Sequence, residues 1–151
     1  MQTHIAHLSP IADDADRSTA SHPVAEFLTT RFARLAFALP FAVFGLFHFM
    51  NAQAMAGMVP VPGGVFWVYV TGAALIAGSV GIVTGVLGRW AAFGLAALML
   101  TFVVFVHARG LGNAAMRPMA MMGLLKDISL MGGALTWAGL LKNGRAARTA
   151  R

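Results

Sequence analysis

The chain has 151 residues, of which 58% are hydrophobic and 11% are charged, and its mean hydropathy is +0.74. Soluble domains carry roughly 25% charged residues, so this chain has too little polar material to cover a water-soluble globule. The absence of cysteine excludes disulfides, thiolate metal sites and thiol–disulfide catalysis. The net charge of +6 would suggest nucleic-acid binding in a soluble protein, but in so apolar a chain it indicates basic residues flanking membrane segments, and no nucleic-acid partner is expected.

The first 22 residues, "MQTHIAHLSPIADDADRSTASH", are polar and mixed in charge. They show no apolar periodicity, and they lack the basic segment followed by an apolar one that marks a secretory signal peptide. We predict a disordered cytoplasmic tail over 1–22. A membrane domain is predicted over 23–142. Its first helix is predicted to begin near Pro23, because proline is tolerated in the first turn of a helix and Glu26 suits that turn.

Four apolar segments follow the tail. No Asp, Glu, Lys or Arg occurs in the 54 residues from Leu35 to Gly88, and "VPVPGG" at 59–64 divides this run because prolines and glycines interrupt helices. Each segment is close to the ~20 residues that cross a ~30 Å hydrocarbon core. The sequence therefore predicts an all-α protein, a four-transmembrane-helix bundle of up-down-up-down topology, followed by a basic tail over 143–151. The predicted helices cover about 33–50, 65–87, 90–108 and 119–141.

Basic residues are distributed unevenly between the two sides of the predicted bundle. Cytoplasmic loops are enriched in Lys and Arg, so the side with more of them is predicted to be cytoplasmic, and both termini lie on it. The connections 51–64 and 109–118 are then predicted to face outward. The cytoplasmic set is Arg17, Arg31, Arg34, Arg89, Lys142, Arg145, Arg148 and Arg151, and the outer set is Arg109 and Arg117.

Small residues recur along one face of the second predicted helix, at spacings of four and three. Bare faces of this kind let helix backbones approach closely in lipid. We expect this face to pack against another helix of the same chain, with a homo-oligomer contact as the alternative. The predicted packing seam comprises Ala74, Gly78, Gly81, Gly85 and Gly88.

Polar side chains from all four predicted helices fall at similar depth. At ~1.5 Å per residue, their levels above the cytoplasmic anchors lie between roughly 21 and 30 Å, in the outer third of the bilayer. We therefore predict one polar layer or pocket that opens outward and binds a ligand, without assigning a catalytic residue or a metal. Its candidate residues are His48, Asn51, Tyr69, His107, Lys126 and Asp127.

Two opposite charges lie side by side in "MMGLLKDISLMGG" at 121–133. Adjacent residues on a helix point about 100° apart, so Lys126 and Asp127 are not expected to neutralise each other directly. Asp127 is the only acid after Glu26, and an unpaired carboxylate in lipid is costly. We expect Asp127 to face the bundle interior and to pair with a histidine, His48 or His107, while Lys126 lies nearer the aqueous mouth.

Several stretches resemble the DoxX family of small four-helix membrane proteins. They are "ARLAFALPFAVFGLFHFMNAQAMAGMVP", "PGGVFWVYVTG" and "MGLLKDISLMGGAL", and the likeness spans about residues 31–142. The connection between Met58 and Gly63 is a little shorter than the family pattern, so the outer loop is expected to differ. The family takes its name from association with a terminal quinol oxidase and with thiosulfate:quinone oxidoreductase. The resemblance implies a multi-pass protein of the bacterial inner membrane, with other membrane redox subunits as partners.

Three functions are consistent with these features. The first is a redox-associated subunit that binds a quinone in the outer polar layer, because quinone carbonyls need hydrogen-bond donors and quinone chemistry needs proton exchange. The second, less favoured, is a b-type haem held by His48 and His107. The third is a non-catalytic membrane partner or lipid-binding protein, in which the polar layer only fixes helix packing. No nucleotide-binding motif is present, and whether the chain catalyses a reaction alone is left open.

Overall fold

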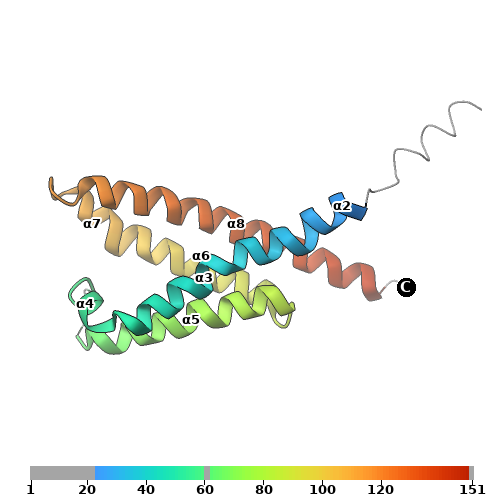
Figure 1. The fold of residues 1–151 in the computed structure, drawn as a ribbon, viewed down its shortest axis with the longest axis horizontal. Coiled ribbons are helices and arrows are strands. Elements are labelled where there is room, and N and C mark those ends of the chain that lie inside the picture. Colours follow the sequence, from blue (N-terminus) through green and yellow to red (C-terminus); the bar gives the residue numbers. More distant parts are fainter. Residues whose placement is uncertain (1–22, 60–61, 150–151) are drawn as a thin grey trace, which may run out of the picture. The chain divides into compact units, whose positions relative to one another are not determined.

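A computed structural model describes residues 23–59 and 62–149, so the predicted tail over 1–22 lies outside the described residues. The described residues are mostly helical and include no strand, which confirms the all-α prediction. Its contacts divide it into a first unit that ends at Ala33 and a second unit, Arg34–Arg151. The bundle discussed below is the second unit, whose helices are drawn in Figure 1.

The chain before the first connection is helical from Pro23 onward, through α2 (Pro23–Glu26), the π-helix η1 (Phe27–Phe32) and α3 (Ala33–Met50). After Met50, most of the loops between helices are short, and the last helix extends into the predicted basic tail over 143–151. The remaining elements are α4 (Ala52–Ala56), α5 (Gly64–Thr84), α6 (Gly88–Phe102), the π-helix η2 (Val103–His107), α7 (Ala108–Leu111) and α8 (Arg117–Thr149).

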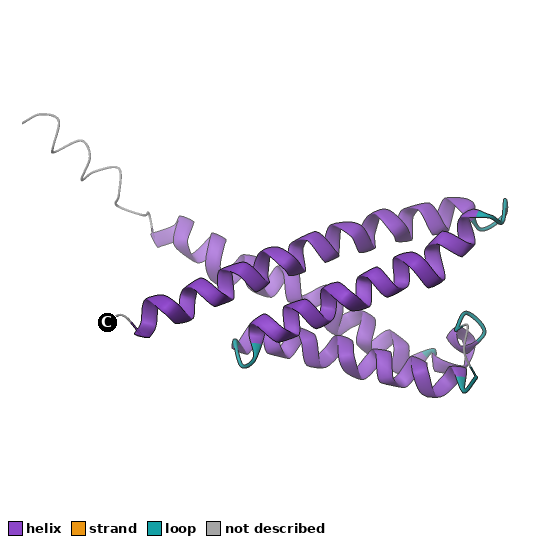
Figure 2. Cartoon of the chain, turned by 180° about the vertical axis from the view of Figure 1, so that it is seen from behind, coloured by secondary structure: helices purple, strands orange, loops and turns teal. Residues whose placement is uncertain are grey.

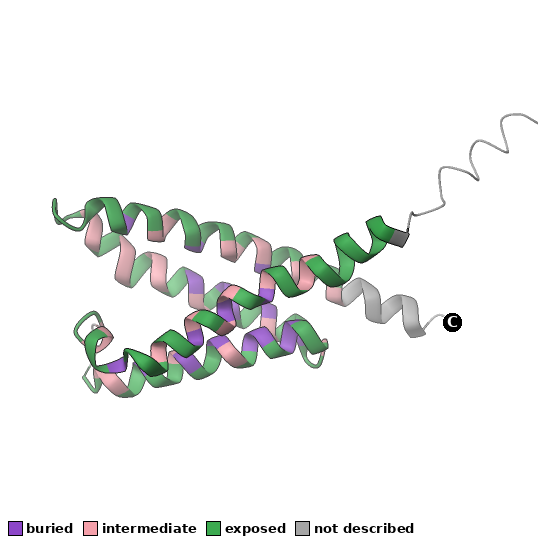
Figure 3. Cartoon of the chain, in the orientation of Figure 1, coloured by how far each residue is buried: buried purple, intermediate pink, exposed green. Residues whose placement is uncertain are grey.

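Four helical segments are long and apolar enough to cross a membrane. They are Val24–Met50, Gly64–Thr84, Gly88–Leu111 and Arg117–Leu141. Large apolar side chains such as Leu39 and Trp90 are exposed. Exposed positions occur along the length of these helices (Figure 3). A monomeric soluble protein rarely exposes so much apolar surface, whereas in a bilayer that surface contacts lipid.

The core of the bundle is narrow and rich in small residues. Side chains from α3, α5, α6 and α8 meet in one buried cluster, in which Phe41, Leu75 and Ile82 are the largest completely buried apolar groups. Alanines fill most of the remaining positions, which lets the helices approach closely. The buried cluster comprises Ala38, Phe41, Leu75, Ile82, Ala92, Leu95, Ala96, Met99, Ala134 and Ala138.

Helices α3 and α5 pack backbone to backbone. A Cβ atom added to Gly45 would lie 2.8 Å from the carbonyl oxygen of Gly72, so neither position tolerates a larger residue without movement. Nearby, the buried hydroxyl of Ser79 donates a hydrogen bond of 2.9 Å to the carbonyl oxygen of Ala38. Polar links of this kind help to hold helices together where no water competes.

The middle of the predicted packing seam lies against α6. Gly78 and Gly81 are buried, and Cβ atoms there would lie 2.6 Å from Leu95 Cγ and from Ala91 Cβ. Both contacts are to α6, so these two glycines pack within the chain. Ala74 is exposed and lies outside the seam.

The C-terminal part of the predicted seam is a turn and not a continuous helix. Helix α5 ends at Thr84, three residues before the predicted end, because Gly85 takes a left-handed conformation with φ 77°. Leu87 is also left-handed, with φ 50°, and Gly88 begins α6. A Cβ atom on Gly88 would lie 2.9 Å from Leu141 Cδ1 of α8, so this glycine brings α6 and α8 together.

Within the second unit, the pair α3 and α5 separates from the pair α6–α7 and α8 toward one end of the bundle (Figures 1 and 2). The short helix α4 lies at that end, and the turn at 112–116 closes the other pair there. We call this end of the bundle the α4 end. The separation of the two pairs leaves the space in which the candidate site lies.

Candidate functional site

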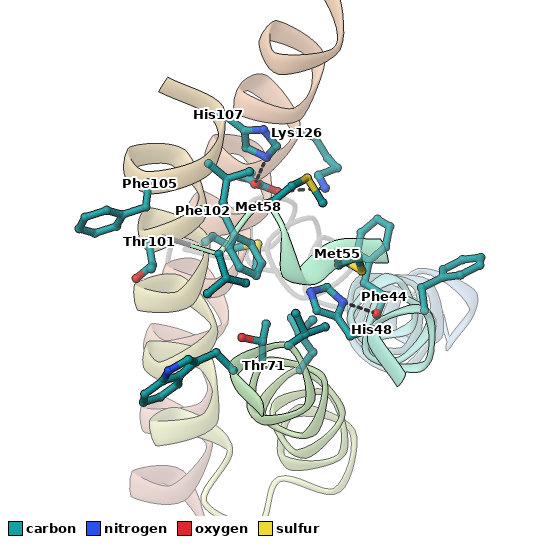
Figure 4. Close-up of a pocket in the computed structure, with 18 of the residues that line it drawn as sticks. Phe44, His48, Met55, Met58, Thr71, Thr101, Phe102, Phe105, His107 and Lys126 are labelled. Carbon is teal, nitrogen blue, oxygen red and sulfur yellow. Dashed lines mark hydrogen bonds and ion pairs between the residues drawn. The ribbon is translucent and has the colours of Figure 1, made fainter. Parts of the chain in front are cut away.

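A cavity of about 610 Å³ lies between the helix pairs at the α4 end (Figure 4). Its walls are mostly aromatic, aliphatic and methionine side chains, with a small number of polar groups. The polar lining residues are His48, Thr71, Thr101, His107, Lys126 and Asp127, and the apolar ones include Phe44, Met55, Met58, Trp67, Val68, Leu75, Met99 and Phe102. Such a composition is typical of small-molecule sites, in which a few polar groups orient an apolar ligand.

Asp127 is fully buried and lies between two cationic or potentially cationic side chains. Its Oδ2 atom is 2.8 Å from His107 Nε2, and its Oδ1 atom is 3.1 Å from Lys126 Nζ (Figure 4). The expected pairing of Asp127 with a histidine is therefore present, and the partner is His107. Lys126 is about half exposed at the edge of the cavity, whereas Asp127 is not reached by solvent.

The two contacts of Asp127 are attractions between charges more than directed hydrogen bonds. Both carboxylate oxygens lie within ion-pair distance of a nitrogen, yet neither accepts an aligned hydrogen bond from the described residues. A buried carboxylate with unused acceptor capacity is expensive to maintain, and removing one member of a buried ion pair leaves the other uncompensated. The geometry thus leaves both buried carboxylate oxygens with unused acceptor capacity.

The direct approach of Lys126 to Asp127 corrects the expectation that these neighbours would not neutralise each other. Their Cβ atoms do point in different directions, but the four-carbon stem of lysine is long enough to bend around the helix. Lys126 Nζ also lies 4.4 Å from the centre of the Phe44 ring. This cation–π contact links α8 to α3 across the edge of the cavity.

His107 reaches Asp127 because of two local features. It is the last residue of the π-helix η2, whose wider turn shifts the register of this segment relative to an α-helix. Opposite, Gly123 offers no side chain: a Cβ atom there would lie 2.6 Å from His107 Nδ1 and 2.8 Å from Nε2, with Cε1 closer still. The imidazole therefore rests directly on the backbone of α8, one turn before Asp127.

His48 lies on the other side of the cavity and is not a partner of Asp127. Its Nδ1 atom is 2.7 Å from the carbonyl oxygen of Phe44, one turn earlier on α3. A carbonyl oxygen only accepts, so Nδ1 carries the proton, and the second ring nitrogen, Nε2, faces the cavity (Figure 4). The ring also stacks on Phe102, with centroids 6.1 Å apart and planes inclined by 18°.

Two predicted members of the polar layer lie outside the cavity lining. Asn51 is exposed, and its Nδ2 atom donates to the carbonyl oxygen of Phe47 at 3.0 Å. Tyr69 packs against Phe49, with centroids 5.6 Å apart, on the outer face of α5. Both were expected at the depth of the cavity, but depth along a helix does not determine which way a side chain points.

Some lining residues were missed by sequence reasoning. Met55 and Met58 come from α4 and the turn after it, a segment predicted as a plain connection, and Thr71 and Phe102 come from within the second and third spans. A signal for Met55 and Met58 does exist in the sequence, because they are three residues apart and would share one face of a short helix. The described residues contain no group of three or more His, Cys, Asp or Glu side chains that could hold a metal ion.

Comparison with known families gives one match. The family model for DoxX matches residues 30–108, just over half of the chain, and covers α3 to η2 with both His48 and His107. Lys126 and Asp127 lie beyond the matched region. Comparison with curated proteins and with solved structures gives no match. Together with the four apolar spans, the family match identifies the chain as a multi-pass membrane protein that belongs to the DoxX family.

Proposed function

We propose that the cavity binds a quinone-type small molecule and that the protein acts as a redox-associated membrane subunit. The observation that carries the proposal is the arrangement of polar groups around an apolar cavity of about 610 Å³. His48 lies at one side, and the assembly of His107, Asp127 and Lys126 lies at the other. A flat ring with oxygen atoms on opposite edges suits such a site, because each oxygen meets a polar group while the ring contacts apolar side chains.

The polar groups are suited to the proton exchange of quinone chemistry. Lys126 has N–H groups beyond the one directed at Asp127 and would donate to a quinone oxygen at the open edge. At the opposite side, His48 Nε2 has a lone pair that would accept a proton from a quinol hydroxyl, because Nδ1 already carries the ring proton. Oxidation of a quinol releases two electrons and two protons. The electrons would pass to a partner redox subunit, one proton would pass to His48 Nε2, and the other would pass to water at the half-exposed edge beside Lys126.

The orientation of the protein is part of the same proposal. The uneven distribution of basic residues supports cytoplasmic termini in the inner membrane of a bacterium, which would place the α4 end and its cavity at the outer side. A quinone dissolved in the bilayer could then reach the cavity through its half-exposed edge near Lys126. Protons would exchange with the outer aqueous phase.

The proposal can be tested by tryptophan fluorescence. Trp67 lines the cavity, whereas Trp90 and Trp137 do not, so a short-chain quinone should quench the wild-type protein saturably and Trp67→Phe much less. Asp127→Asn should weaken the binding, because it removes the charge that positions His107 and Lys126. Equal, linear quenching of the wild type and Trp67→Phe would contradict a quinone site here.

The two alternatives have less support. A haem iron would need the ring nitrogen of His107 that is directed at Asp127, so bis-histidine ligation would have to break that pair. A non-catalytic, lipid-binding role is favoured by one observation: the contacts of Lys126 with Phe44 and of His107 with Asp127 join different helices and could serve packing alone. A lipid extract of the purified protein that contains phospholipid and no quinone would favour this role.

A further inference from the structure

Helices α5 and α6 are in close contact near the turn that joins them and form a wall of the cavity at the α4 end. A Cβ atom added to Gly81 would lie 2.6 Å from Ala91 Cβ, and one added to Gly78 would lie 2.6 Å from Leu95 Cγ. Toward the α4 end, the pair α3 and α5 separates from the pair that contains α6 (Figures 1 and 2). The cavity therefore lies where α5 and α6 are no longer in close contact.

Facing residues of α5 and of the segment after Leu95 line this part of the cavity. From the contact at Gly78, two turns of ~3.6 residues toward the α4 end bring Thr71 level with Phe102. A third turn brings Trp67 level with Val106, in the π-helix η2. These facing pairs all belong to the lining of the cavity.

The lining between these two segments runs from buried to exposed side chains. Val68 is 3% exposed, whereas Trp67 beside it is 45% exposed and Phe105 on η2 is 48% exposed. Thr101 is also exposed and lies with Phe105 at the edge of the space opposite His48 in Figure 4. Because the same side chains line the cavity and reach the molecular surface, the cavity has an opening between α5 and α6 that faces the lipid.

The two openings of the cavity differ in polarity. At the other opening, the ammonium group of Lys126 lies 4.4 Å from the ring centre of Phe44 and is half exposed. A hydrocarbon chain there would take water away from a charged group, which is costly. Between α5 and α6, none of the exposed lining residues that the structure describes carries a charge. The hydroxyl of Thr101 donates to the carbonyl oxygen of Ala97 at 2.9 Å, so this opening suits a hydrocarbon chain.

We propose that the hydrocarbon tail of the bound quinone leaves the cavity between α5 and α6, while its ring stays between His48 and Lys126. This inference rests on the proposed function, and it adds the class of ligand, a quinone with a long isoprenoid tail. The tail would pass Trp67, Thr101 and Phe105 and continue into the lipid. A tailed quinone would then enter here and not at the edge near Lys126, which is left to water and protons.

The test compares two quinones that share one ring, in a variant with a narrower opening. Thr101→Phe places a larger side chain there, and it breaks no link between helices, because the hydroxyl of Thr101 bonds within its own helix. A dimethoxy-methyl-benzoquinone without a tail should bind this variant as it binds the wild type. The same ring with a tail of several isoprene units should bind the variant roughly tenfold or more weakly, because the tail and the new ring would compete for one space.

Quenching of Trp67 fluorescence measures both affinities in detergent. Comparing each quinone only with itself, between variant and wild type, cancels its partition into the micelle. Tail length alone is not the readout, because a hydrocarbon tail gains little on moving from one apolar environment to another. The matched control is Leu100→Phe, at the neighbouring position, which is exposed and does not line the cavity. The control should bind both quinones as the wild type does.

The possible outcomes separate this inference from the proposed function. Equal affinity of the tailed quinone for the wild type and Thr101→Phe would overturn the inference, as would the same loss in Leu100→Phe. An equal loss of both quinones in Thr101→Phe would place the ring at Thr101 and would also overturn it. If neither quinone binds the wild type, the quinone site itself is refuted.

Photolabelling of the wild type gives a measure that needs no variant. A quinone with a diazirine on its tail should label α5, α6 or η2 near Trp67 and Phe105. Labels on α3, or on α8 around Lys126, would show that the tail leaves at the other opening and would overturn the inference.

Discussion

Gly123→Ala should separate His107 from Asp127 without changing either residue. The added methyl carbon would lie 2.6 Å from His107 Nδ1 and 2.8 Å from Nε2. Non-bonded heavy atoms are at optimal separation at about 3.5–4.0 Å, so the imidazole must move by about 1 Å. The contact between Nε2 and Asp127 Oδ2, at 2.8 Å in the wild type, would not survive that displacement.

The expected cost follows from the burial of Asp127. Losing one partner of a fully buried ion pair costs roughly 3–5 kcal/mol, but Lys126 stays on the other carboxylate oxygen, so we expect about 2–3 kcal/mol. Alanine is the better helix former by about 1 kcal/mol, which reduces the net destabilisation to about 1–2 kcal/mol. The measurement is reversible unfolding in mixed micelles, monitored by circular dichroism.

Two controls isolate the effect. Gly132→Ala lies on the same helix and its added methyl group meets nothing within 4 Å, so it should be neutral or slightly stabilising. In a His107→Ala background, Gly123→Ala should lose its penalty, because there is no ring left to displace. The reasoning would be refuted if Gly123→Ala were as stable as Gly132→Ala in the wild-type background, or if the penalty persisted without His107.

Three further predictions concern the ion pair, the helix packing and the topology. Asp127→Asn should lower the free energy of unfolding by roughly 1–3 kcal/mol more than Lys126→Gln does, because Asp127 is buried and contacts two partners whereas Lys126 is half exposed. A larger loss in Lys126→Gln would contradict the assignment. Gly81→Leu should disrupt the bundle, because its Cβ atom would lie 2.6 Å from a side chain of α6. At Gly94 an added Cβ atom meets nothing within 4 Å, so Gly94→Leu should be tolerated, and equal melting temperatures of the two variants would argue against close packing at Gly81. A reporter that is active only in the cytoplasm should be active when it is fused after Arg151. Activity of a reporter that works only in the outer compartment would reverse the proposed orientation.

The membrane architecture could be predicted from the sequence because its cause is local. A run of 54 residues without Asp, Glu, Lys or Arg cannot be covered by polar groups, and "VPVPGG" is the natural place for it to break. Hydrophobicity and helix-breaking residues act within a few positions of themselves, so the amino-acid order alone is enough to locate the four spans. The end of the second helix was predicted three residues too late for the same reason. The apolar pattern continues past Gly85, where the chain makes a left-handed turn that hydrophobicity does not reveal.

The pairing of Asp127 was predicted only as far as a histidine on another helix. Charge balance in lipid required a partner, and two histidines stood at a suitable depth. The choice between His48 and His107 depended on the π-helix η2 and on the bare backbone at Gly123, neither of which changes the hydrophobic pattern. The spacing of residues in the sequence gives only the directions of their Cβ atoms. It therefore did not predict that the flexible side chain of Lys126 brings Nζ to Asp127 Oδ1.

Sequence by itself therefore determined which segments enter the membrane and which side chains must find a partner there. Only the tertiary structure decided that Asn51 and Tyr69 face away from the cavity and that Met55 and Met58 face into it. The rotation of each helix about its own axis is set by contacts such as that of Gly45 with the Gly72 backbone, which join residues far apart in the chain. Hydrophobicity decides whether a helix lies in the bilayer, and close packing between helices decides which of its faces points toward the interior of the bundle.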